Sequence, residues 1–141
     1  MGSVLRTIDL PASADEVWSV VGDFNGLPRW NAGIAASELS ENGRRRTLTL
    51  KAGGSVVEDL VEYDPAARRL SYSFVQSPVP VTHHKATLEV VDRGPNQSTV
   101  RWSCEFEPKG TDVASVGPIF ARIFESGLQE LAGLFGGQGR K

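Results

Sequence analysis

A chain of 141 residues can form one domain with an ordinary buried core and needs no metal ion or disulfide for stability. Hydrophobic residues make up 40% and charged residues 23%, and the net charge of −2 disfavours a nucleic-acid partner, because binding to phosphates requires a basic face. The single cysteine, Cys104, excludes an internal disulfide, and no apolar run reaches the roughly 18 residues of a membrane span, so we expect a cytoplasmic protein without stable membrane insertion.

The N-terminal region predicts one strand followed by two short helices. Apolar residues alternate over residues 4–10, and Pro11 ends this strand. Ser13 and Glu16 have the spacing of a capping box, which predicts a helix over residues 14–21. The sequence Gly22 to Gly26 breaks that helix, and residues 27–30 suggest a second short one.

Six further strands are predicted by alternating residues and by the turn sequences between them. They cover residues 35–39, 44–51, 55–63, 69–77, 81–92 and 98–107. Short loops between strands are typical of an antiparallel meander. The run Arg44-Arg45-Arg46 is interpreted as a solvated strand edge, with attraction of an anionic ligand or partner as the alternative.

A long helix is predicted over residues 113–135, with Asp112 as its cap, although Gly117-Pro118 could kink its first turn or delay its start to Pro118. Spacings of three and four place its large apolar residues on one face: Ile119, Phe120, Ile123, Phe124, Leu128, Leu131, Leu134 and Phe135. One helix cannot fill the concave side of a strongly bent sheet, so we expect a cavity between them.

This order of elements resembles the START-like helix-grip (SRPBCC) superfamily, most closely bacterial polyketide cyclase/dehydrase-like proteins similar to the plant abscisic-acid receptors. The resemblance is carried by residues 11–18, by 23–24 with 30–31, by 54–60, by 68–72 with 78–81, and by Trp102. It implies an α+β fold in which about seven antiparallel strands wrap around the C-terminal helix. It covers almost the whole chain as one domain, 1–141, whose residues 136–141 we expect to be a flexible tail.

The resemblance also implies where ligand contacts and entrance loops lie. The ligand-binding positions fall on Trp30, Asn31, Ile34, Ile119, Ile123 and Gly127, and the entrance loops fall on Lys51, Ala52, Gly53, Gly54 and Ser55 and on Pro78, Val79 and Pro80. Asn31 stands where the plant receptors grip a carboxylate with lysine, and Gly53-Gly54 replaces their leucine-proline latch. A hormone-triggered phosphatase partner is therefore not expected.

Glu58 and His84 are the candidate catalytic residues. Glu58 matches a cavity-facing family position, where burial would raise its pKa, and the alternative is a surface carboxylate beside Asp59 and Glu62. Alternation places His84 on the face of Ala86, where it could bind a ligand oxygen or exchange protons. Adjacent His83 points the opposite way, so we expect no metal site.

Tyr72, Phe74 and Trp102 face inward by the same alternation and are either core or ligand contacts. Gly127 costs a helix about 1 kcal/mol relative to alanine, so we expect a spatial reason, the simplest being extra room at the cavity. Cys104 is expected to be an inert core residue.

Three functions are compatible with these features. The first is binding of a hydrophobic small molecule that is lipid-, polyketide- or terpenoid-like. The second is a cofactor-independent cyclase or dehydratase that uses Glu58 or His84 for proton transfer, and the third is a protein-interaction module, which would have a filled interior. No cofactor is expected, and the chain could be a monomer or a homodimer.

Overall fold

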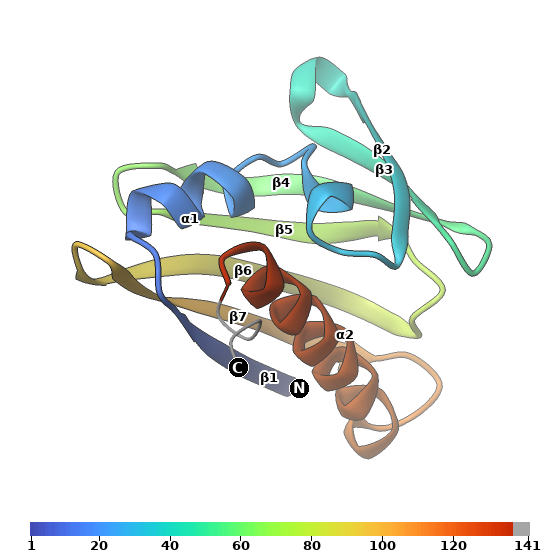
Figure 1. Ribbon diagram of the computed structural model, residues 1–141. Helices are drawn as coiled ribbons and strands as arrows, with labels where there is room; N and C mark the ends of the chain where they lie inside the picture. The colour runs from blue at the N-terminus through green and yellow to red at the C-terminus, as the bar shows by residue number, and fades with distance from the viewer. Residues whose placement is uncertain (137–141) are drawn as a thin grey trace.

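The computed structural model describes residues 1–136, and the expected tail lies outside them except for Gly136. Seven strands form one antiparallel sheet: β1 (Gly2–Leu10), β2 (Ile34–Ser40), β3 (Arg45–Leu50), β4 (Ser55–Asp64), β5 (Arg69–Gln76), β6 (Val81–Gly94) and β7 (Gln97–Pro108). Their order across the sheet is β1-β7-β6-β5-β4-β3-β2. The α+β helix-grip fold is therefore confirmed, with most predicted boundaries within two residues of the observed ones (Figure 1).

The first two helical segments lie between β1 and β2. Helix α1 (Ala14–Val21) begins with the predicted capping box, in which Ser13 accepts from the Glu16 amide and the Glu16 side chain accepts from the Ser13 amide. A short 3-10 helix, Leu27–Arg29, follows it. A further 3-10 turn, Glu41–Gly43, joins β2 to β3.

Helix α2 (Val113–Leu134) lies across the sheet and packs mainly against β1 and β7 (Figure 1). The Asp112 side chain caps it by accepting from the Ser115 amide at 2.9 Å. A start delayed to Pro118 is wrong. The helix runs through this residue, which leaves the carbonyl of Ala114 without its helical donor, but Ala114 is exposed and water can bond there. No helix within residues 1–136 is both long and apolar enough to cross a membrane.

The buried stripe of α2 is narrower than the sequence predicts. Val116, Phe120, Phe124, Leu128 and Leu131 are buried, whereas Leu134 is 53% and Ile123 41% exposed. Leu134 is the last helical residue, and Ile123 faces an open pocket instead of packed side chains. Because α2 packs over β1 and β7, it leaves the inner face of β3, β4 and β5 largely uncovered by the helix.

The pairing between β5 and β6 is short. Only Arg69–Tyr72 pair with Ala86–Glu89, although each strand continues beyond these residues. Residues 73–76 remain paired with β4, and residues 81–85 remain with β7, so the two strands diverge toward the loop of residues 77–80 (Figure 1).

Candidate functional site

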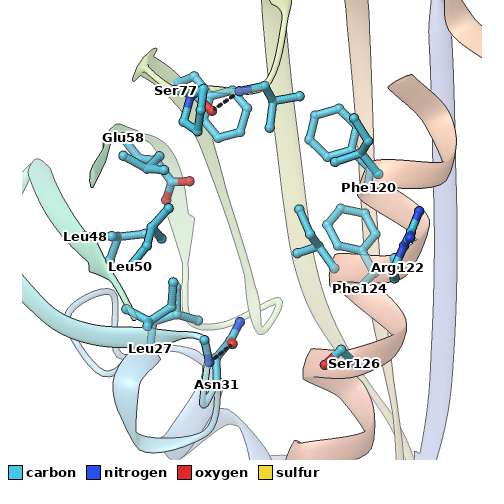
Figure 2. Close-up of a pocket in the computed structure, with 18 of the residues that line it drawn as sticks. Leu27, Asn31, Leu48, Leu50, Glu58, Ser77, Phe120, Arg122, Phe124 and Ser126 are labelled. Carbon is cyan, nitrogen blue, oxygen red and sulfur yellow. Dashed lines mark hydrogen bonds between the residues drawn. The ribbon is translucent and has the colours of Figure 1, made fainter. Parts of the chain in front are cut away.

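A cavity of about 650 Å³ lies between α2 and the inner face of the sheet, and it opens to solvent. Its walls are mainly apolar and come from the Leu27–Ile34 segment, strands β3 to β7, the loops at Ala52 and 77–79, and one face of α2 (Figure 2). The expected hollow interior is therefore present. The cavity exists because α2 packs against β1 and β7 and leaves the opposite half of the concave face of the sheet open.

Nine of the sequence-predicted ligand-binding residues line this cavity, with Ile123 at its exposed edge. They are Asn31, Ile34, Glu58, Tyr72, Phe74, His84, Trp102, Ile119 and Ile123. Trp30 and Gly127 do not line it. Both are buried, and they contact the Trp102 ring from behind the cavity wall.

The entrance loops contribute fewer lining residues than expected. Ala52 lines the cavity from the β3–β4 turn, and Pro78 and Val79 line it from the β5–β6 loop, together with Ser77. Lys51, Gly53, Gly54, Ser55 and Pro80 are not lining residues. Gly53 and Gly54 both have positive φ, 109° and 87°, so they form the hairpin turn that places Ala52.

Glu58 is a buried member of a charge pair, only 5% exposed, and not a surface carboxylate. Its Oε1 accepts from Arg46 Nε at 2.8 Å and lies 2.7 Å from Arg46 Nη2. Burial raises the pKa of Glu58 above its ordinary value, and the charge and hydrogen bond of Arg46 oppose that rise.

Arg46 was missed as a site residue, and its interpretation as a solvated strand edge is wrong. It is 3% exposed, donates from Nη1 to the Phe24 carbonyl at 2.6 Å, and stacks 4.2 Å from the Phe24 ring centroid. The signal was present in the sequence, since Arg46 alternates in phase with inward-facing Leu48 and Leu50. The neighbouring arginines, Arg44 and Arg45, obscured it.

An aromatic stack spans the divergence between β5 and β6. The rings of Phe74 and His84 lie 3.7 Å apart and nearly parallel, and Phe120 of α2 lies 5.3 Å from the His84 ring. Burial lowers the pKa of His84 to about 4, so its ring is uncharged at neutral pH. Its Nδ1 is buried and has no partner within residues 1–136.

Trp102 fixes the deep wall of the cavity. Its indole N–H donates to the Tyr72 hydroxyl at 3.0 Å, and its ring stacks on Phe124 at 4.5 Å. A Cβ on Gly127 would lie 2.8 Å from this ring. The space that glycine leaves is thus filled by Trp102, and it is not extra room for a ligand as the sequence suggested.

Asn31 gives the floor of the cavity a neutral polar group (Figure 2). Its Oδ1 accepts from the Gly33 amide at 3.1 Å, which holds the side-chain orientation. The adjacent Ala32 amide donates to Glu130 of α2 and ties this segment to the helix.

Cys104 lies outside this cavity, on the inner face of β7. It is 2% exposed, and burial raises the pKa of its thiol to about 12, as expected for a core residue. Within residues 1–136, no three His, Cys, Asp or Glu side chains are grouped so that they could hold a metal ion.

Comparison with known proteins agrees with this architecture. The model of the polyketide cyclase/dehydrase and lipid transport family matches residues 1–136. No curated protein matches the sequence of this chain.

Solved structures resemble the chain over nearly its full length. Protein XoxI from Bacillus cereus is 32% identical with a TM-score of 0.93, and 96% of each chain is covered. A Thermobifida fusca protein is 33% identical with a TM-score of 0.86, covering 96% of this chain and 94% of that one. The di-domain aromatase/cyclase BexL, from the BE-7585A biosynthetic pathway, is 27% identical with a TM-score of 0.77, and the match covers 96% of this chain and 45% of BexL.

The fold, its open cavity and the match over residues 1–136 agree, and the chain belongs to the polyketide cyclase/dehydrase and lipid transport family.

Proposed function

We propose that this protein binds a hydrophobic small molecule in the cavity between α2 and the sheet. The observation that carries the proposal is the cavity itself, because about 650 Å³ of mainly apolar, solvent-connected space is the size of a small-molecule site. The interaction-module alternative expects a filled interior and has no comparable support.

The affinity of such a site would come mainly from apolar burial, at about 25 cal/mol per Å² before the losses of association. The wall offers flat aromatic surfaces from Phe74, Phe120 and Trp102. Asn31 and Glu58 lie on different walls and would orient a ligand that carries polar groups at both ends. The family description, which includes lipid transport and polyketide cyclisation, supports ligands of this class.

A cyclase or dehydratase activity is a second candidate, favoured by one observation. Glu58 and His84, the two titratable side chains expected to act, both line the same cavity. His84 is uncharged at neutral pH and would act as a proton acceptor, while the Glu58 carboxylate is held by Arg46. If proton transfer depends on Glu58, Glu58→Gln abolishes turnover in protein that still binds a ligand measurably, and unchanged turnover excludes that role.

The binding proposal can be tested by filling the cavity. Ile119→Trp places a large ring on the α2 wall, whereas Val61→Trp adds the same ring at an exposed β4 position outside the cavity. We expect the first variant to weaken binding of the uncharged fluorescent probe Nile red at least tenfold, and the second to leave it unchanged. Equal binding by both folded variants would contradict the proposal. Native mass spectrometry of protein purified from its own host would identify a retained ligand.

A further inference from the structure

Each of the three nitrogens of the Arg46 guanidinium has a partner within the cavity wall. Two of its nitrogens contact Glu58 Oε1, at 2.8 Å and 2.7 Å, and Nη1 donates to the Phe24 carbonyl. The rings of Phe24 and Tyr72 lie 4.2 Å and 4.8 Å from its central carbon. Arg46 is not a lining residue, so it stabilises the negative charge of Glu58 from behind and offers no donor to a ligand.

Glu58, by contrast, lines the cavity, and its carboxylate points into it (Figure 2). Both Arg46 contacts use Oε1. No donor within residues 1–136 forms a hydrogen bond with Oε2. The two Arg46 nitrogens on Oε1 favour the ionised carboxylate against the effect of burial, and an ionised carboxylate only accepts hydrogen bonds. The cavity therefore presents an acceptor that requires a donor from the ligand.

Arg46 is already paired with Glu58, and the inner wall offers no second cation that could pair with a ligand anion. His84 is uncharged at neutral pH, and Asn31 is neutral. Arg122 lines the cavity from α2 but is exposed to solvent, where water screens its attraction for an anion. A ligand carboxylate inside the cavity would therefore face the Glu58 carboxylate across a space of low polarity.

We propose that Glu58 makes the cavity selective for uncharged ligands that carry a hydroxyl or another hydrogen-bond donor, such as phenols and alcohols, and excludes carboxylate anions. Arg46 is a positioning residue that opposes protonation of Glu58 and holds its carboxylate in place. This inference rests on the proposed small-molecule binding and narrows it, because free fatty acids and other carboxylates would be poor ligands. A donor to a charged acceptor forms one of the stronger hydrogen bonds in proteins.

Three probes of nearly the same shape test this selectivity by isothermal titration at pH 7. At that pH 2-naphthol is an uncharged donor, 2-methoxynaphthalene lacks the O–H, and 2-naphthoate is an anion. We expect 2-naphthol to bind about tenfold more tightly than its methyl ether. We expect 2-naphthoate to bind at least 100-fold more weakly than 2-naphthol, since its carboxylate would lose hydration on entering a mainly apolar cavity and meet the Glu58 carboxylate with no free cation beside it.

The variants Glu58→Gln and Asp59→Asn form a matched pair. Each removes one carboxylate from β4, but Asp59 pairs with Arg45 at 2.7 Å and is not a lining residue. Glu58→Gln should bring 2-naphthol and its methyl ether within about threefold of each other and raise 2-naphthoate affinity at least tenfold, because Arg46 is no longer neutralised. Adding Arg46→Met should remove that gain, and Asp59→Asn should match the wild type.

The wild-type comparison decides the proposal even if Glu58→Gln does not fold. Binding of 2-naphthoate as tight as that of 2-naphthol overturns it, whichever residue holds the anion. Equal binding of 2-naphthol and its methyl ether also overturns it, while small-molecule binding itself would stand. If none of the three probes binds, this inference fails, and the proposed function is decided separately by the binding of Nile red.

Discussion

Substituting Gly127 by alanine tests how tightly α2 is held against the deep wall. The new Cβ would lie 2.8 Å from Trp102 Cζ3 and 3.5 Å from Asn31 Nδ2. The Trp102 ring cannot easily move away, since it stacks on Phe124 and its N–H is bonded to Tyr72. Overpacking of this kind costs roughly 1–3 kcal/mol, against a helix-propensity gain of about 1 kcal/mol. We expect a net loss of about 1 kcal/mol in the free energy of unfolding.

Gly133→Ala is the matched control, because a Cβ at Gly133 in the same helix would meet no atom within 4 Å. It should stabilise the protein by up to about 1 kcal/mol, since only the propensity gain remains. Urea denaturation followed by circular dichroism measures both variants, and their difference isolates the overpacking cost. If Gly127→Ala proves as stable as Gly133→Ala, the close fit of α2 to Trp102 is not what the structure indicates.

Three further predictions each concern one side chain: the imidazole of His84, the carboxylate of Asp112 and the thiol of Cys104. The pKa of His84 is about 4 in the folded protein and 6.5 ordinarily, so as the pH falls the unfolded chain takes up a proton at this residue before the folded protein does. The contribution of neutral His84 to the free energy of unfolding is therefore complete above pH 6.5 and is lost as the pH falls toward 4. Between pH 7.5 and 5, wild-type protein should therefore lose about 1–2 kcal/mol more than His84→Phe, whereas the exposed-site variant His83→Gln should behave like the wild type in urea titrations. Asp112→Ala should lower the free energy of unfolding by about 1 kcal/mol and Asp112→Asn by much less, because asparagine also caps helices; equal losses in thermal melts would exclude the cap. The thiol of Cys104 should remain unmodified by Ellman's reagent in native protein and react fully in denaturant, and rapid native modification would contradict its burial.

The sequence predicted the architecture well because its signals agree with one another. The capping box at Ser13, the cap at Asp112 and the alternation in β6 and β7 each have a local cause that the tertiary structure preserves. The predicted start of α2 at Val113 is confirmed, but Pro118 left a later start open, because the cost of proline depends on whether the freed carbonyl reaches water. That exposure is a property of the folded protein and not of the local sequence.

The site was less predictable where it depends on pairing between strands. Glu58 was expected in the cavity, but its partner Arg46 lies 12 positions away and becomes its neighbour only through the β3–β4 register. A charged run normally indicates a solvated surface, and here one member of the run is buried because a carboxylate neutralises it. Gly127 was recognised as unusual, but whether a ligand or a side chain fills the space beside it depends on where the Trp102 ring lies.

Because β5 and β6 diverge early, residues 73–76 and 81–85 form a seam in the cavity wall. Side chains close this seam, and no backbone hydrogen bonds cross it. Its closure is the Phe74–His84 ring stack, a contact of the kind worth about 0.5–1.5 kcal/mol. Separating β5 from β6 at this point parts two rings and breaks no backbone hydrogen bond between the strands. The cavity wall can therefore widen here at far lower cost than between residues 83–92 of β6 and their partners on β7, where the pairing is uninterrupted.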